Sequence, residues 1–345
     1  MFRKCTSFLV ALIVTCGLAS VAFAAAPCKN SGNLAARYCD ADGDLTADPP
    51  ADSKEWEDPD TLVFGDTPLE DIEDYADIFN DFMKFLSAKT GKKVEYRPMA
   101  SNSSGIEDMR SGRLHIASFS TGATGYAVNL AGYVPIAVKG TEKEFQGYRL
   151  IVLVKKDSPY QKLHDIKGKK VAHTGPTSNS GHIAPMALFP QEGVTPGKDY
   201  EIVFSGNHEK SVLGVLKGEY DAACVGSSLY DRVVNAGDAK ADDFRTIWRS
   251  SQFPTSSFGY VYNLKPELAQ KIRAAFFEYR FTPKMINAFG KTDRFSPATY
   301  IRDYKLARMI AVAGGEKFDE MGLKAMAESE KKTAARTAPK KAPAP

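Results

Sequence analysis

The chain has 345 residues, of which 43% are hydrophobic and 25% charged, and its formal net charge is +3 at pH 7. Residues 1–24 contribute +2 and residues 331–345 contribute +5, which leaves −4 for residues 25–330. A mildly acidic body argues against a nucleic-acid-binding protein, which usually presents a basic face. After residue 24, no apolar run approaches the ~20 residues that a membrane-spanning helix needs.

The first 24 residues have the pattern of a secretory signal peptide. Arg3 and Lys4 precede an apolar run over 8–18, and Ala-Phe-Ala at 22–24 offers a small-x-small cleavage site. The apolar run is shorter than a membrane span. We therefore predict export, a periplasmic location and a mature chain that begins after Ala24.

Residues 25–60 form a polar, acidic leader that contains two of the five cysteines. Cys28 and Cys39 lie 11 positions apart, and in an exported protein this spacing predicts one disulfide. Two other cysteines leave with the signal peptide. The fifth, Cys224, stands in an apolar run, so we expect it to be buried and unreactive.

Four aspartates in the leader, Asp40, Asp42, Asp44 and Asp48, alternate around a glycine as in the first half of a calcium loop. The bidentate glutamate expected at the twelfth loop position is replaced by Ala51. Two interpretations therefore stay open, a calcium site and a merely acidic leader. No other cofactor or metal is expected.

From residue 61 onward, short apolar segments alternate with amphipathic ones. Strands are predicted over 61–65, 94–96, 116–119, 148–155, 169–172, 200–204, 222–225 and 259–262. Helices are predicted over 71–90, through Ile106 and Met109, and over 181–189, 210–217, 266–280 and 303–313. The alternation predicts an α/β fold with parallel sheets, and roughly 270 ordered residues predict two α/β lobes. The tail at 329–345 is rich in Lys, Ala, Thr and Pro, so we predict that it is disordered.

Four loops at predicted strand ends are rich in serine, threonine and glycine. In open α/β sheets, ligands bind beyond the carboxyl ends of the strands, where unpaired backbone N–H groups at helix starts attract anions. Plain helix capping is the alternative for any single loop. The candidate ligand-binding residues in these loops are Ser118, Ser120, Thr121, Ser178, Asn179, Ser180, Ser228 and Ser256.

His208 adds a titratable group in the loop 204–209, where it can donate to an oxyanion. An enzyme interpretation would make Ser180 a nucleophile and His208 its base. No Gly-x-Ser-x-Gly elbow surrounds Ser180, and no acid is placed by sequence to orient the histidine, so we expect no catalysis.

Three segments resemble the phosphate, phosphite and phosphonate solute-binding proteins of ABC importers. They are TSNSGHIAP at 177–185, FSGNHE at 204–209 and GEYDAA at 218–223, and the similarity covers about 60–325. The resemblance implies a type II periplasmic-binding-protein fold, with two α/β lobes joined by two crossing strands near 152–156 and 257–261. Lobe 1 would then comprise 61–154 and 259–328, and lobe 2 would comprise 155–258.

The resemblance also implies roles for individual residues. Ser178, Asn179 and Ser180 would bind the oxyanion at a helix start, with His208 as a further donor. Three positions depart from the aminophosphonate binders, namely Phe119 and Asn102 where a tyrosine is expected and Ser256 where a carboxylate is expected. An ammonium group without a partner is costly to bury. The expected ligand is therefore phosphate, phosphite or a small alkylphosphonate.

Two functions follow from this resemblance. The first is capture of the oxyanion by a monomeric protein for a membrane ABC permease. The alternative is a sensor that presents the same ligand to a membrane histidine kinase.

Overall fold

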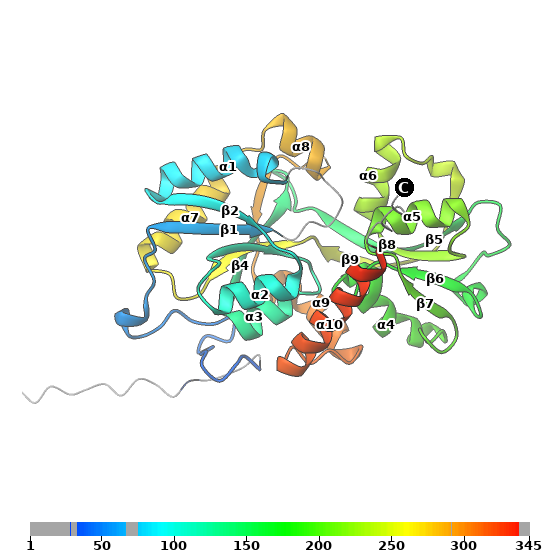
Figure 1. The fold of residues 1–345 in the computed structure, drawn as a ribbon, viewed down its shortest axis with the longest axis horizontal. Coiled ribbons are helices and arrows are strands. Elements are labelled where there is room, and N and C mark those ends of the chain that lie inside the picture. Colours follow the sequence, from blue (N-terminus) through cyan, green and yellow to red (C-terminus); the bar gives the residue numbers. More distant parts are fainter. Residues whose placement is uncertain (1–27, 29–32, 67–74, 291, 338–345) are drawn as a thin grey trace, which may run out of the picture.

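The structure is a computed structural model that describes residue 28 and residues 33–66, 75–290 and 292–337. The predicted signal peptide lies outside these residues. The described chain forms two α/β lobes side by side, each built on its own sheet (Figure 1). The prediction of two α/β lobes is confirmed.

The first lobe is built on a six-stranded sheet in the order β11-β4-β10-β3-β1-β2. Strand β1 pairs in parallel with β2 and β3, whereas β10 runs antiparallel between β3 and β4. The strands are β1 (Thr61–Asp66), β2 (Lys93–Pro98), β3 (Ile116–Phe119), β4 (Tyr133–Gly140), β10 (Ser257–Val261) and β11 (Arg294–Pro297).

The second lobe is built on a five-stranded sheet in the order β7-β6-β8-β5-β9. Strand β5 lies between β8 and β9 and is buried continuously from Leu150 to Val154, as its apolar sequence predicts for a strand covered on both faces. The strands are β5 (Gly147–Lys155), β6 (Lys170–His173), β7 (Glu201–Phe204), β8 (Ala222–Gly226) and β9 (Phe244–Pro254).

Helices cover both sheets. The α-helices are α1 (Tyr75–Thr90), α2 (Asn102–Arg110), α3 (Thr124–Ala131), α4 (Ala184–Leu188), α5 (His208–Lys217), α6 (Ser227–Ala236), α7 (Pro266–Glu278), α8 (Pro283–Phe289), α9 (Lys305–Ala313) and α10 (Glu320–Thr337). Short 3-10 helices lie at Ser53–Glu55, Leu163–Ile166, Phe189–Glu192 and Ala241–Asp243, and π-helical turns at Asn179–Ile183 and Tyr300–Tyr304. Helix α1 packs against α7, with its apolar stripe turned to the lobe 1 core, as its three-and-four spacing predicts.

The crossing points differ from those that the family resemblance implies. Strand β5 belongs wholly to the second sheet, where Val152 lies opposite both Cys224 of β8 and Trp248 of β9. The chain therefore crosses between β4 and β5, at 141–146, and returns at 255–256. The predicted boundary at 154/155 is wrong, because the apolar run of β5 is buried between two neighbouring strands of lobe 2. The second boundary lies within two residues of its predicted position.

Helix α9 packs against both lobes, in addition to the two chain crossings. Ala307 lies in the core of the second lobe and Ala311 in the core of the first. The assignment of 259–328 wholly to lobe 1 is therefore wrong for α9, which packs against α4.

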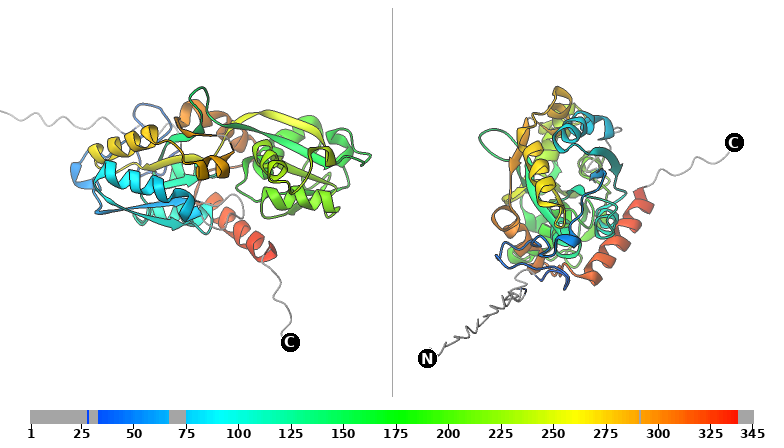
Figure 2. Two further views of the ribbon diagram at one scale, coloured as in Figure 1. Left: turned by 90° about the horizontal axis from the view of Figure 1, so that it is seen from above. Right: turned by 90° about the vertical axis from the view of Figure 1, so that its left-hand side faces the viewer.

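The C-terminal tail is more ordered than its composition predicts. Helix α10 continues to Thr337, so the prediction of disorder from residue 329 is wrong up to that point. Leu323 and Met326 bury one side of this helix in the core of lobe 1. Seen from above, α10 projects from one side of the two lobes (Figure 2). The remaining tail, 338–345, lies outside the described residues.

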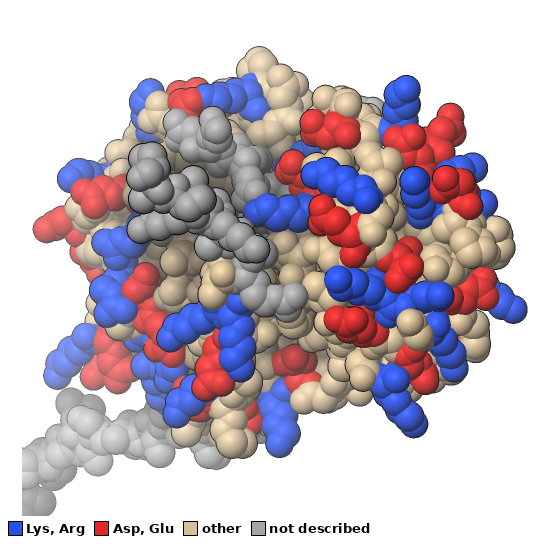
Figure 3. All heavy atoms as spheres, turned by 45° about the vertical axis from the view of Figure 1, so that its right-hand side comes forward, with Lys and Arg blue, Asp and Glu red and all other residues tan. Residues whose placement is uncertain are grey.

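The acidic leader is packed onto lobe 1. Leu34 and Tyr38 enter the lobe 1 core, and the predicted Cys28–Cys39 disulfide is formed, with a Cα–Cα distance of 5.2 Å. Within the described residues, no helix is long and apolar enough to cross a membrane. On the face in Figure 3, Lys and Arg are interspersed with Asp and Glu, and neither sign dominates the view.

Candidate ligand-binding site

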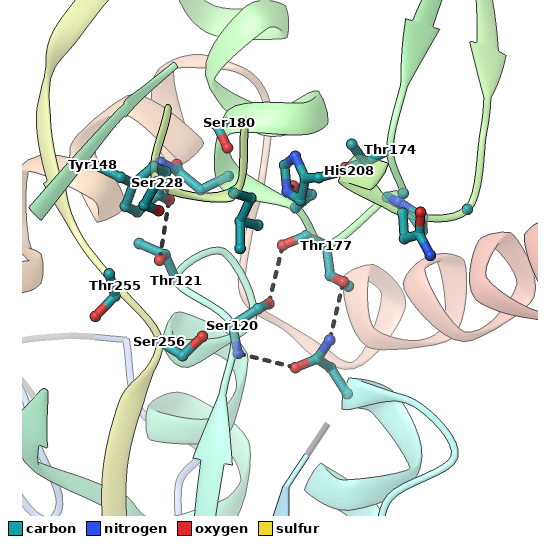
Figure 4. Close-up of a pocket in the computed structure, with 18 of the residues that line it drawn as sticks. Ser120, Thr121, Tyr148, Thr174, Thr177, Ser180, His208, Ser228, Thr255 and Ser256 are labelled. Carbon is teal, nitrogen blue, oxygen red and sulfur yellow. Dashed lines mark hydrogen bonds between the residues drawn. The ribbon is translucent and has the colours of Figure 1, made fainter. Parts of the chain in front are cut away.

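A cavity of about 1300 Å³ lies between the lobes, and residues from both lobes line it. Its wall is rich in hydroxyl groups, which come from strand ends and helix starts (Figure 4). Eight of the nine residues predicted from the sequence line this cavity: Ser120, Thr121, Ser178, Asn179, Ser180, His208, Ser228 and Ser256.

The ninth, Ser118, does not line the cavity. It is the last residue but one of β3, where it is buried opposite Asp66 at the end of β1. Its hydroxyl group donates a hydrogen bond to the Asp66 carboxylate. Burial raises the pKa of Asp66, whereas the hydrogen bond from Ser118 and the charge of Lys139 act to lower it. Ser118 therefore stabilises a buried acid, because an unpaired carboxylate in the core would be costly.

Ser178 lies at the centre of the predicted anion cradle in lobe 2. It is the N-cap of the π-helical turn 179–183, and its Oγ accepts a hydrogen bond from the backbone N–H of Gly181 at 3.0 Å. Its Oγ is also 3.2 Å from Nε2 of His208, the first residue of α5.

The hydrogen bonds of His208 define which nitrogen carries its proton. The backbone N–H of Gly226 donates to Nδ1 at 3.1 Å, so Nδ1 is an acceptor. Burial lowers the pKa of His208 to about 3, which leaves a neutral ring with its proton on Nε2. Nε2–H then donates to Ser178 Oγ. His208 thus positions Ser178, and a direct hydrogen bond from His208 to the ligand stays a prediction.

The same bonds orient the hydroxyl proton of Ser178. Its Oγ accepts from Gly181 and from His208, so its acceptor positions are both used. The remaining proton can donate only to a further acceptor. Because Ser178 lines the cavity, that acceptor can be a ligand oxygen.

A second chain of hydrogen bonds orients Asn179. Thr121 Oγ1 donates to the Pro254 carbonyl at 3.0 Å, Tyr148 donates its hydroxyl proton to Thr121 Oγ1 at 3.1 Å, and Asn179 Nδ2 donates to the Tyr148 oxygen at 3.0 Å. Since the chain ends on a carbonyl, each donor has one possible direction. The Asn179 Oδ1 atom must therefore point away from Tyr148.

Three buried oxygens around the cavity have no hydrogen-bond partner among the described residues: Thr174 Oγ1, Asn179 Oδ1 and Thr255 Oγ1. Buried polar atoms are normally paired, so an unpaired one at a cavity wall indicates a place for a ligand or water. A Cβ added at Gly181 would lie 1.8 Å from Thr174 Oγ1 and 2.7 Å from Ser178 Oγ. Glycine at this position therefore keeps the space between two hydroxyl groups open.

Thr177 joins the two lobes at the base of the cavity. Asn102 Nδ2 of lobe 1 donates to its Oγ1 at 3.1 Å, and Ser120 Oγ of lobe 1 donates to its carbonyl oxygen at 3.2 Å. A Cβ added at Gly122 would lie 2.3 Å from the same carbonyl oxygen. The lobes thus touch through backbone at this point.

Sequence reasoning missed several residues of the site: Asn102, Tyr148, Thr174, Thr177 and Thr255. Thr177 and Thr255 belong to the hydroxyl-rich loops, so the loop composition could have identified them. Tyr148 begins an apolar strand, and nothing in the sequence separates it from a core residue.

Two further expectations concern the Ser180–His208 pair and Cys224. His208 contacts Ser178 rather than Ser180, so the serine–histidine pair considered for catalysis is not formed. Cys224 is free and fully buried, as expected, and burial raises the pKa of its thiol.

For calcium, Asp40, Asp42 and Asp44 place their oxygens within 4.8 Å of one another, whereas Asp48 accepts a hydrogen bond from Ala41. A calcium site there stays a hypothesis.

The chain is similar to known binding proteins over most of its length. A family model for the periplasmic substrate-binding protein of phosphonate ABC transporters matches residues 64–304. The phosphate-import protein PhnD of Mycolicibacterium smegmatis is 30% identical over 63% of this chain and 71% of its own. The phosphonates-binding periplasmic protein of Escherichia coli is 25% identical over 68% of this chain and 70% of its own.

Solved structures share the fold, and the predicted type II periplasmic-binding-protein class is confirmed. A binding protein component of an ABC phosphonate transporter from Pseudomonas aeruginosa superposes with a TM-score of 0.62 at 23% identity, and covers 81% of this chain and 99% of its own. PhnD1 from Prochlorococcus marinus in complex with methylphosphonate gives a TM-score of 0.63 at 18% identity, and covers 74% of this chain and 98% of its own. The family match and the two-lobed fold agree, and the chain belongs to the family of periplasmic substrate-binding proteins of phosphonate ABC transporters.

Proposed function

We propose that this protein captures a small phosphorus oxyanion, namely phosphate, phosphite or a small alkylphosphonate, outside the cytoplasm and delivers it to an ABC permease. The observation that carries the proposal is the cleft wall, where the Ser178 hydroxyl has a proton left to donate. In the same wall, the buried hydroxyl groups of Thr174 and Thr255 have no hydrogen-bond partner among the described residues. Hydroxyl and backbone donors suit an oxyanion, since a charge-assisted hydrogen bond is stronger than a neutral one.

The names of the relatives support the same ligand class. One is named as a phosphate-import protein, one as a phosphonates-binding protein and one as a phosphite-binding protein of an ABC transporter. These names support the importer rather than the sensor, and support export of the chain by its predicted signal peptide. We expect the protein to act as a monomer whose lobes close over the ligand.

Two of the three departures from aminophosphonate binders lie at the cavity. Phe119 is buried against Tyr133 and does not line the cavity, whereas Asn102 and Ser256 do line it. At these two positions neither the amide nor the hydroxyl compensates an ammonium charge, which favours a bare oxyanion or a small alkylphosphonate.

A calorimetric screen of the mature protein tests the proposal. The ligands are phosphate, phosphite, methylphosphonate, aminoethylphosphonate, sulfate and arsenite. Ser178→Ala removes the oriented donor, and we expect a loss of about 1.5–3 kcal/mol, roughly 10- to 150-fold in affinity. Ser251→Ala, on the exposed side of β9 and away from the cavity, is the control. Absence of binding to every phosphorus oxyanion, or full affinity in Ser178→Ala, would contradict the proposal.

A further inference from the structure

Helix α10 lies outside the part of the chain that the family model matches, yet it forms part of the cleft. The family match ends at residue 304, whereas α10 begins at Glu320. Leu323, Ala327, Glu330 and Ala334 are among its residues that line the cavity. In Figure 1 the helix overlaps the junction of the two lobes, and Figure 2 shows that it lies on one side of them.

The first half of α10 is anchored firmly on lobe 1. Both carboxylate oxygens of Glu320 accept hydrogen bonds from Arg110 of α2, at 2.7 and 3.1 Å. Leu323 and Met326 are buried in the lobe 1 core, with exposed fractions of 3% and 6%. The helix therefore moves with lobe 1, and its second half extends along the cleft.

Glu330, in the second half, contacts the start of α2. Its Oε2 accepts hydrogen bonds from the backbone N–H of Ser103 at 3.2 Å and from the Ser103 hydroxyl at 2.5 Å. Ser103 is the second residue of α2, so this N–H is one of the first-turn donors that lack a partner within the helix. A carboxylate is favoured there, because the helix start carries a partial positive charge.

The start of α2 belongs to the same cavity as the anion cradle of lobe 2. Ser101, Asn102, Ser103 and Ser104 all line it, together with Ser178. A ligand oxyanion has the same chemistry as the Glu330 carboxylate, and both accept hydrogen bonds from N–H and hydroxyl donors. Two negative charges within one partly desolvated cavity also repel each other.

We propose that Glu330 is a built-in competitor for the anionic ligand, because its carboxylate occupies the start of α2 and lowers the affinity of the cleft for oxyanions. The inference rests on the proposed function, since it assigns a regulating residue to the same site. Glu330 thereby raises the ligand concentration at which half of the protein is occupied. Its effect is strongest on ligands with two negative charges.

Calorimetric titration of the full mature chain with phosphate and with methylphosphonate tests this role. Glu330→Gln keeps the size of the side chain and one acceptor oxygen for Ser103, but removes the negative charge. We expect about two- to fivefold tighter binding, the scale of a partly exposed charge interaction.

Glu328→Gln is the matched control, because Glu328 lies two residues away on the exposed side of α10 and does not line the cavity. Its affinity should stay at the wild-type value. Unchanged or weaker binding in Glu330→Gln, or equal tightening in Glu328→Gln, would overturn the inference while the proposed function stands. If neither the wild type nor Glu330→Gln binds either anion, both the inference and the proposed function fail. Binding by Glu330→Gln alone would support the competitor role strongly.

Discussion

Closure of the lobes can be tested at Gly122, where the two lobes approach through backbone. A Cβ at this position would lie 2.3 Å from the Thr177 carbonyl oxygen and 2.4 Å from Ile183 Cδ1, both in lobe 2. An ordinary contact begins at 3.4 Å, so Gly122→Ala requires the lobes to separate by about 1 Å at this point. Gly122 does not have a positive φ, so alanine is compatible with its backbone conformation.

The separation has a predictable cost. A carbonyl oxygen held by Ser120 cannot move aside as a flexible side chain could. The hydrogen bonds from Asn102 and Ser120 to Thr177 would lengthen, and overpacking costs of this kind amount to about 1–3 kcal/mol. Because ligand binding depends on the closed state, we expect affinity to fall by roughly 5- to 150-fold.

Calorimetry gives the affinity, and small-angle X-ray scattering with and without ligand gives the degree of closure. Gly175→Ala is the control, since a Cβ there meets no atom closer than 4.0 Å, although Gly175 also lines the cavity. The reasoning would be refuted if Gly122→Ala closed on its ligand and bound it as tightly as the wild type.

Three further predictions concern stability, oxyanion binding and metal binding. Burial lowers the pKa of His182 to about 4 and that of His208 to about 3, so below pH 6.5 the unfolded chain binds protons that the folded chain does not. Urea titrations should show the free energy of unfolding falling by about 1.4 kcal/mol per pH unit for each histidine between pH 6.5 and 4, and a flat profile would contradict this. Gly181→Ala should weaken oxyanion binding measured by calorimetry, because its methyl group enters the space beside Thr174 Oγ1; unchanged affinity would argue against the cradle. If the acidic leader binds calcium, millimolar calcium should raise the melting temperature of the wild type but not of Asp42→Asn, and no shift in either favours a merely acidic segment.

Much of the fold follows from periodicity. The apolar run of β5 predicts a buried strand, and the three-and-four spacing in α1 predicts an amphipathic helix. Both predictions agree with the observed elements. The run of β5 does not say which lobe contains it. That depends on pairing with β8 and β9, which is a long-range property of the chain.

The tail shows a different limit of sequence reasoning. Residues 329–337 are polar and rich in lysine and alanine, and composition alone predicts disorder. They are helical because Leu323 and Met326, one or two turns earlier, anchor the same helix in the lobe 1 core. Alanine and lysine have high helix propensity, so a helix anchored at one end extends through them.

The sequence predicts which loops form the site, but not the hydrogen bonds between their side chains. Serine and threonine at strand ends indicated the right positions, and eight of the nine residues line the cavity. The direction of each proton was not predictable, because it depends on a backbone N–H of Gly226 and a carbonyl of Pro254 that only the folded chain brings close.

Those directions lead to a final prediction about ligand choice. The hydrogen-bond chain that ends on the Pro254 carbonyl turns Asn179 Oδ1 away from Tyr148 and leaves it buried without a partner. An unpaired buried acceptor costs about 1–3 kcal/mol, which a ligand can recover only by donating a proton. Hydrogen phosphate and the monoanion of methylphosphonate carry such a proton, whereas sulfate does not.

Phosphate should therefore bind more tightly than sulfate by roughly 5- to 150-fold, although the two anions have nearly the same size and shape. Methylphosphonate supplies an internal control, because its affinity should fall as its last proton is lost while sulfate binding stays weak at every pH. Burial keeps the pKa of His208 near 3, so the protein does not supply a competing titration at the cleft near neutral pH. Equal affinities for phosphate and sulfate would show that Asn179 Oδ1 is satisfied by water, and that the cleft selects its ligand by charge alone.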